Sequence, residues 1–189
     1  MSAAARSDEV RAVPPYRLGD VHLSHEEIST RVAELGREIA ADYAGRDLLL
    51  LVVLKGAVVF ATDLSRAVGA PHSLDFVSLA GYGGSPDQPA AARLLKDLDA
   101  PIVGRDVLVV ENVVDTGLTL NYLLKTLALR DPASLAVCTL LDRPHRRLVE
   151  DLPMRYVGFP APDEFFVGYG FQLEGRYCAL PELRLLVRS

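Results

Sequence analysis

The chain has 189 residues, of which 50% are hydrophobic and 24% charged, and its formal net charge is −5. This length fits a single domain over 1–189, and the absence of a basic stripe argues against nucleic acid as a partner. The longest apolar run, residues 48–54, is too short to cross a membrane, so we expect no membrane partner either. Two cysteines and an N-terminus without an apolar leader predict a cytoplasmic protein without disulfides.

The first half of the chain alternates helical and strand patterns after a predicted mobile tail at 1–15. Ser24 and Glu27 have the spacing of a capping box, and the apolar residues that follow predict a helix over 25–43. The run 48–54 predicts a parallel strand buried on both faces. Lys55 and Gly56 then interrupt the pattern, and a second helix is predicted to end near Val68.

The second half continues the alternation, which implies crossover units and a mostly parallel sheet. Strands are predicted at 72–79, 93–98, 107–110 and 134–141, with a helix at about 119–129. Residues 80–92, rich in Gly, Pro and Ala, are predicted to form a flexible loop. Three short strand candidates, 156–158, 166–168 and 183–187, have no helices between them, and we expect them to cap the sheet edge.

The segment VLVVENVVDTGLTL, residues 107–120, carries the clearest chemical pattern. Four apolar residues end in Glu111 and Asn112, and DTGLT at 115–119 precedes a helix. Ligands of open α/β sheets bind at the carboxyl ends of strands, and backbone N–H groups at a helix start attract anions. Gly117 allows close approach of the backbone, and Thr116 and Thr119 add hydroxyl donors. The segment therefore predicts a phosphate-binding loop.

This segment resembles the phosphoribosyl-diphosphate signature of type I phosphoribosyltransferases. Six more blocks between about 23 and 186 resemble hypoxanthine–guanine phosphoribosyltransferases: LLLLVVLKGAVVF (48–60), LDFVSLAGYGG (74–84), RLLKDLD (93–99), LLDRPHRR (140–147), YVGFPAPDEFFVGYG (156–170) and RYCALPEL (176–183). The resemblance implies an α/β fold, with a parallel sheet flanked by helices and a small hood from the N-terminal and C-terminal segments. It also implies transfer of 5-phosphoribosyl from its diphosphate to a 6-oxopurine, Mg²⁺ as cofactor, and a homodimer or homotetramer.

The resemblance also implies a role for each matched residue. Asp115 would be the base beside purine N7 and, with Thr116, Gly117, Leu118 and Thr119, would surround the 5′-phosphate. Glu111 and Asn112 would face the ribose hydroxyls, Lys55 and Gly56 the diphosphate, and Tyr82 would lie on a loop that closes over the reacting centre. Arg143, Phe165 and the Val157 backbone would contact the purine. Glu111, Asn112 and Gln172 would be the candidate Mg²⁺ ligands.

Several positions depart from the family pattern. Asn112 and Gln172 replace acids, Cys178 replaces an arginine, Ala80-Gly81 replaces a serine pair, and Arg143 replaces a lysine. These changes fall mainly on the metal and diphosphate side, whereas the monophosphate loop is intact. Three functions therefore remain open at this point: a purine phosphoribosyltransferase, a repurposed paralogue with another acceptor or reaction in specialised metabolism, and a non-catalytic module that binds a nucleotide.

Simpler interpretations also exist for single residues. Glu111 and Asp115 could be acids that favour a helix start, and Lys55 could be a solvated cation. Only one of Phe165 and Phe166 can face a site. Arg146 and Arg147 are interpreted as a solvated pair, and Cys178 could be an apolar filler.

Overall fold

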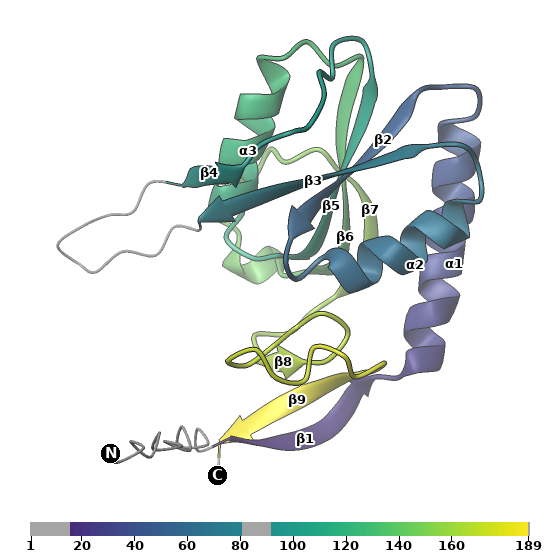
Figure 1. Ribbon diagram of the computed structural model, residues 1–189. Coiled ribbons are helices and arrows are strands. Elements are labelled where there is room, and N and C mark those ends of the chain that lie inside the picture. Colours follow the sequence, from purple (N-terminus) through teal and green to yellow (C-terminus); the bar gives the residue numbers. More distant parts are fainter. Residues whose placement is uncertain (1–15, 81–91, 189) are drawn as a thin grey trace, which may run out of the picture.

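The protein folds into two sheets, a six-stranded main sheet and a three-stranded hood sheet (Figure 1). The computed structural model describes residues 16–80 and 92–188. The elements are β1 (Tyr16–Leu23), α1 (His25–Asp42), β2 (Leu48–Leu54), α2 (Val58–Val68), β3 (Ser73–Ala80), β4 (Arg93–Lys96), β5 (Asp106–Val114), α3 (Leu118–Ala128), β6 (Ser134–Asp142), η1 (Pro144–Arg146), β7 (Met154–Pro160), β8 (Phe166–Val167) and β9 (Leu183–Arg188).

The main sheet has the order β4-β3-β2-β5-β6-β7, and only β4 runs antiparallel to its neighbour. In Figure 1, α3 covers one face of this sheet, and α1 and α2 cover the other. Leu50 and Val52 of β2 pack in the core beneath α1 and α2, whereas Leu49 and Leu51 pack in the core beneath α3. Because successive strand residues point to opposite faces, a strand buried on both sides must be apolar throughout.

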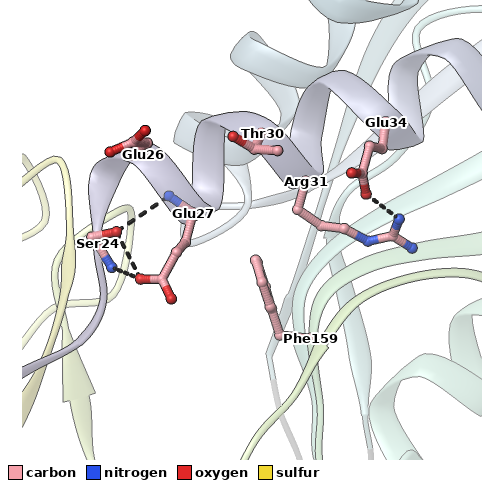
Figure 2. Close-up of a pocket in the computed structure, with 7 residues that line it drawn as sticks. All are labelled: Ser24, Glu26, Glu27, Thr30, Arg31, Glu34 and Phe159. Carbon is pink, nitrogen blue, oxygen red and sulfur yellow. Dashed lines mark hydrogen bonds and ion pairs between the residues drawn. The ribbon is translucent and has the colours of Figure 1, made fainter.

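Helix α1 begins at the predicted capping box. The Ser24 hydroxyl accepts a hydrogen bond from the Glu27 backbone at 3.2 Å, and the Glu27 carboxylate accepts one from the Ser24 backbone at 2.8 Å. Farther along, Arg31 (Figure 2) donates to the carbonyl oxygens of Val157 at 3.0 Å and Gly158 at 3.2 Å. These carbonyls belong to β7, the edge strand of the main sheet, so Arg31 links α1 to that edge.

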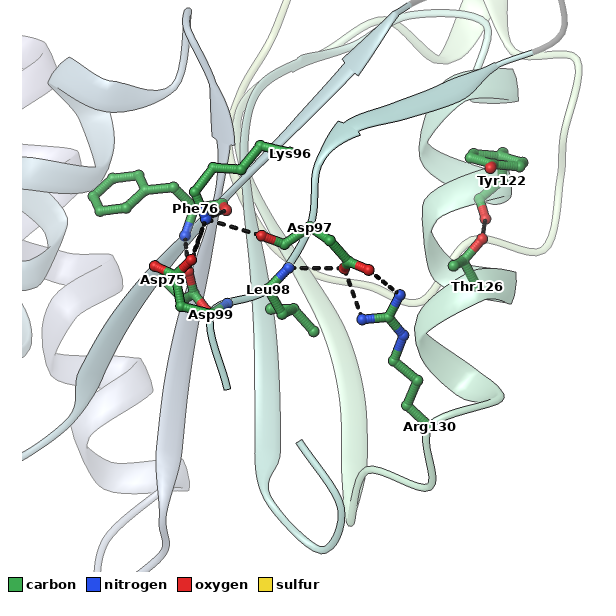
Figure 3. Close-up of polar contacts among 9 residues, drawn as sticks. All are labelled: Asp75, Phe76, Lys96, Asp97, Leu98, Asp99, Tyr122, Thr126 and Arg130. Carbon is green, nitrogen blue, oxygen red and sulfur yellow. Dashed lines mark hydrogen bonds and ion pairs between the residues drawn. The ribbon is translucent and has the colours of Figure 1, made fainter. Parts of the chain in front are cut away.

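A polar cluster holds the segment that follows β4 against β3 and the end of α3 (Figure 3). The buried Asp75 carboxylate accepts from the Asp99 backbone at 2.8 Å, and Lys96 donates to the Phe76 carbonyl at 2.8 Å. Arg130 makes two hydrogen bonds, of 2.7 and 2.8 Å, to Asp97. The cluster thereby fixes the sheet edge where the chain returns to the main sheet.

The predicted α/β class, with a parallel sheet and a hood from the N-terminal and C-terminal segments, is confirmed, but two of the three strand candidates expected to cap the main sheet belong to the hood. The C-terminal strands β8 and β9 form the hood sheet with β1, a strand that we did not predict, instead of capping the main sheet. Only β7 lies at the main-sheet edge, parallel to β6. The predicted tail 1–15 and nearly all of the predicted flexible loop 80–92 lie outside the described residues. No helix in the described part is long and apolar enough to span a membrane.

Candidate active site

The predicted phosphate loop lines a cavity of about 120 Å³ at the carboxyl end of β5, formed by Glu111, Val113, Val114, Asp115, Thr116, Gly117, Thr119 and Leu120. Gly117 is the residue that caps α3, and its φ of 80° places it in the left-handed region that favours glycine. A Cβ there would lie 2.9 Å from Leu152 Cδ1. The first backbone N–H groups of α3 lack partners within the helix and can point at an anion.

A larger cavity of about 410 Å³ lies between α1 and β7 (Figure 2) and is lined by Ser24, Glu26, Glu27, Thr30, Arg31, Glu34 and Phe159. We place the site at the smaller cavity because unpaired polar atoms gather around it at the ends of β5 and β6, although only Asp115 among their residues lines the cavity. Within the described chain, five buried side-chain polar atoms lack a hydrogen bond, and four of them are Asn112 Oδ1, Asp115 Oδ1, Arg143 Nε and Arg147 Nε. Buried polar atoms without partners are costly, so their concentration at the ends of β5 and β6 indicates a ligand site.

Glu111 is the acidic residue of β5 that lines this cavity, together with the strand residues Val113 and Val114. Desolvation raises the pKa of its carboxyl group from 4.5 to about 7, and a hydrogen bond from the Asn112 backbone N–H, at 2.9 Å, partly opposes the rise. A carboxyl group with this pKa exchanges protons readily near neutral pH, as groups at functional sites often do.

Asn112 does not line the cavity with Glu111, because β5 continues to Val114 and adjacent strand residues point to opposite faces. The Asn112 side chain is buried beside Gly56 and Gly170. A Cβ on Gly170 would overlap the Gly56 carbonyl oxygen and lie 3.3 Å from Asn112 Nδ2. The structure therefore brings Asn112 to the loop of Lys55 and Gly56, whose Lys55 side chain is exposed.

The predicted purine side gathers at the end of β6. Arg143 donates a hydrogen bond to the Glu164 carbonyl, and its guanidinium carbon lies 5.5 Å from the centre of the Phe166 ring. Phe166 is buried, whereas Phe165 is 70% exposed. Of the two rings, only Phe165 is therefore free to stack on a flat ligand.

Val157 lies outside this group, and its contact with a purine stays a prediction. Its carbonyl accepts a hydrogen bond from Arg31 of α1, and β7 pairs it with Thr139 of β6. The backbone beside Arg143 belongs instead to Glu164 and Phe166.

The described residues offer no ready-made metal centre, since no group of three or more His, Cys, Asp or Glu among them could hold an ion. Gln172 is exposed and does not line the cavity. Tyr82 lies outside the described residues. Among the predicted metal ligands, the structure places only Glu111 in the cavity.

Arg146 and Arg147 are not a solvated pair, contrary to our interpretation of the sequence. Arg146 Nε lies 3.0 Å from Asp115 Oδ1, and Arg147 forms an ion pair with Asp142. The Arg147 side chain is only 12% exposed and packs beside Gly117. One signal could have indicated these contacts, because both residues closely follow the carboxyl end of the predicted strand 134–141.

Comparisons with known proteins agree with this geometry. The family model of the phosphoribosyl transferase domain matches residues 23–172. A hypoxanthine-guanine phosphoribosyltransferase of Mycobacterium avium is 47% identical over 188 residues, covering 94% of this chain and 92% of the relative. A hypoxanthine phosphoribosyltransferase of Salmonella typhimurium is 46% identical, covering 86% and 92%. A crystal structure of a hypoxanthine-guanine phosphoribosyltransferase from Bacillus anthracis superposes with a TM-score of 0.84 at 40% identity, covering 91% of this chain and 99% of the other. The chain belongs to the phosphoribosyltransferase family.

Proposed function

We propose that the chain is an enzyme that transfers 5-phosphoribosyl from phosphoribosyl diphosphate to a 6-oxopurine and so produces a nucleoside 5′-monophosphate. One observation carries the proposal: the anion-binding start of α3, the carboxylates of Glu111 and Asp115, and the Arg143–Phe165 region all lie at the carboxyl ends of β5 and β6. The relatives reported above carry the names of enzymes with this chemistry. The relatives do not favour a repurposed paralogue or a non-catalytic module.

In this proposal the residues divide the substrate between them. The backbone and hydroxyls of 116–119 hold the 5′-phosphate, and Glu111 contacts the ribose hydroxyls. Asp115 exchanges a proton with purine N7 as general base, which requires a carboxylate within hydrogen-bonding reach of that nitrogen. Arg143 donates to the exocyclic oxygen, and Phe165 supplies an aromatic face for the ring. Lys55 and Gly56 lie nearest the diphosphate.

The proposed cofactor is Mg²⁺, and the donor set favours an ion that enters with the substrate. Mg²⁺ is commonly held by one or two carboxylates together with substrate phosphates. The cavity offers Glu111 and Asp115, and the pKa of about 7 at Glu111 indicates a site where a cation would favour the ionised form. Bound there, the ion would neutralise charge on the leaving diphosphate. Asn112 and Gln172 are the weaker of the three predicted ligands because their amides carry no charge and neither residue lines the cavity.

We also propose that the protein is cytoplasmic and self-associates as a homodimer or homotetramer. Cys138 and Cys178 are free thiols in the described chain, as is usual in a reducing compartment, and this supports the first part. The second part rests on the family resemblance, and sedimentation equilibrium of the purified chain tests it directly.

The deciding experiment measures nucleotide formation from hypoxanthine or guanine with phosphoribosyl diphosphate and Mg²⁺. Asp115→Asn should lower kcat/KM for the purine by about a hundredfold or more, the usual contribution of a general base. Asp47→Asn is the matched control. Asp47 forms an ion pair with Arg105, with 2.8 Å between Arg105 Nε and Asp47 Oδ2, and neither residue lines the cavity. Absence of transfer by the folded wild-type protein would overturn the proposal and favour a nucleotide-binding module.

A further inference from the structure

Arg146 bridges two carboxylates on opposite sides of the proposed site. It ends the short helix η1, which follows β6. Its Nε lies 3.0 Å from Asp115 Oδ1, and its Nη1 donates a hydrogen bond of 3.0 Å to Asp163 Oδ1. Asp115 belongs to the phosphate loop, whereas Asp163 lies two residues before the exposed ring of Phe165. A single side chain therefore joins the phosphate side of the site to its purine side.

The contact with Asp115 is an ion pair and leaves its hydrogen-bonding capacity unused. Asp115 Oδ1 is buried and accepts no hydrogen bond within the described chain, although Arg146 Nε is near, because the N–H group is not aligned with it. The Asp115 side chain as a whole is 36% exposed, so the remainder of the carboxylate faces outward. Arg146 thus offsets the charge of Asp115 and holds one oxygen inward, while acceptor sites stay available to a ligand.

The same short segment also organises the purine side. Arg143, three residues earlier, donates to the Glu164 carbonyl and lies against the Phe166 ring. Arg146 adds the contact to Asp163. The loop that carries Phe165 is therefore held at two points by residues 143–146, and one of these points is also the partner of Asp115.

We propose that Arg146 is a positioning residue of the active site, which sets the orientation of Asp115 relative to a purine stacked on Phe165. This inference rests on the proposed function. It assigns Arg146 no contact with substrate: the residue acts through Asp115 and Asp163. No other Lys, Arg or His among the described residues pairs with Asp115, so the loss of Arg146 would leave that carboxylate free to turn.

The first test compares steady-state kinetics of Arg146→Met, Asp163→Asn, the double variant and Arg146→Lys. Arg146→Met should lower kcat/KM for the purine about tenfold, with the KM for phosphoribosyl diphosphate within about twofold of wild type. Asp163→Asn should give a smaller loss in the same direction. The double variant should have the same kcat/KM for the purine as Arg146→Met, because both changes remove the same bridge between Asp115 and Asp163. Arg146→Lys should have part of the wild-type activity. Lysine restores the positive charge beside Asp115, but it lacks the guanidinium group that reaches both carboxylates.

Arg155→Met is the matched control. Arg155 forms a 2.8 Å ion pair with Asp42, and the side-chain exposures of 45% and 40% resemble the 39% and 36% of Arg146 and Asp115. This pair lies on α1 and β7, outside the cavity. Its loss should leave both KM values unchanged, and the melting temperatures of the two arginine variants show whether either change acts through stability alone.

A binding measurement keeps the inference testable without turnover. By titration calorimetry, Arg146→Met should bind a purine nucleoside 5′-monophosphate about tenfold more weakly than wild type but should bind ribose 5-phosphate equally well. An inactive wild-type protein with this binding pattern would overturn the proposed function and still support the role of Arg146. An active wild-type enzyme whose kcat/KM for the purine is unchanged in Arg146→Met would overturn the role of Arg146 alone. Equal losses for both ligands would also overturn it.

Discussion

Glu111 lies where the apolar part of β5 meets the cavity, and the cost of burying its charge has a measurable consequence. Its pKa rises from 4.5 to about 7 in the folded chain. A folded-state pKa above the unfolded value favours the protonated folded protein, so this stabilisation is complete below about pH 4.5 and is lost as the pH rises through 7. We expect the free energy of unfolding of the ligand-free protein to fall by up to about 3 kcal/mol across this range because of Glu111.

Denaturant unfolding at several pH values checks this expectation when wild type is compared with Glu111→Gln. The variant cannot ionise at this position, so its stability should decline less between pH 4.5 and 7. Parallel pH profiles for the two proteins would show that the Glu111 carboxyl group is not desolvated as described.

Gly117 combines a left-handed backbone with close neighbours, so an added methyl group should damage the phosphate loop in two ways. Its φ is 80°, and a Cβ would lie 2.9 Å from Leu152 Cδ1 and 3.2 Å from Arg147 Cδ. Gly117→Ala should cost about 1–2 kcal/mol through backbone strain alone and should weaken binding of a nucleoside monophosphate at least tenfold, as measured by calorimetry.

Gly104→Ala is the control for that substitution. Gly104 has a φ of 72°, yet nothing lies within 4 Å of its would-be Cβ. Gly104→Ala should introduce the same backbone strain and lower the free energy of unfolding by a similar amount. Its affinity for the nucleoside monophosphate should stay at the wild-type value. Equal affinity for both variants would mean that the loop does not hold the phosphate.

The site residues differ in how far the sequence reveals them. The loop 115–119 is contiguous in the sequence, so phosphate binding could be predicted for it without knowledge of the fold. Val157 was assigned to the purine through the family resemblance. In the structure its carbonyl accepts a hydrogen bond from Arg31, and the ring that lies against Arg143 belongs to Phe166. Arg146 was missed because its pairing with Asp115 depends on how η1 turns after β6.

At the level of elements, prediction succeeded where burial dictates composition. Strand β2 is covered on both faces, so a continuous apolar run was sufficient to define it. Strand β1 is largely exposed, and its sequence YRLGDVHL mixes polar and apolar residues. Its partner β9 lies at the other end of the chain. A strand stabilised mainly by a distant partner has a weak local signal, which is why β1 was not predicted.

The segment between β8 and β9 contains Gln172 and Cys178, two positions predicted to depart from the family pattern, and exchanging them tests whether they limit donor binding. Gln172 is exposed, and Cys178 is partly buried, with its carbonyl accepting from the Gly170 backbone at 2.9 Å. Gln172→Asp together with Cys178→Arg should strengthen binding of phosphoribosyl diphosphate in Mg²⁺. Each charge-assisted contact is worth about 1.5–3 kcal/mol, so the gain could reach about a hundredfold or more.

Ribose 5-phosphate serves as the reference ligand for the double variant because the loop 115–119 is unchanged. Its affinity should stay at the wild-type value, whereas phosphoribosyl transfer should increase. Asn112→Asp alone should have a smaller effect, since the Asn112 amide can already make the hydrogen bond to a sugar hydroxyl that a carboxylate would make. Unchanged donor affinity in the double variant would show that these positions do not face the diphosphate.

At the scale of the whole molecule, the proposed ligand would connect the two sheets. The phosphate loop follows β5 of the main sheet, whereas Phe165 precedes β8 of the hood. Arg143, at the end of β6, already spans this junction through the Glu164 carbonyl and the Phe166 ring. A ligand that carries both a phosphate and a purine should therefore order both parts, and a ligand with the phosphate alone should order only one.

Hydrogen exchange measures this difference directly. A purine nucleoside 5′-monophosphate should slow amide exchange in 115–120 and in 165–167, whereas ribose 5-phosphate should slow it only in 115–120. Both ligands should be used at about 100 times their Kd, where each stabilises the bound state by about 2.7 kcal/mol. Both ligands then stabilise the protein equally against global unfolding. A difference between the two exchange patterns therefore reports only the local ordering of residues 165–167 in the hood. Identical patterns would mean that Phe165 does not contact the purine, and that the ligand is held by the main sheet alone.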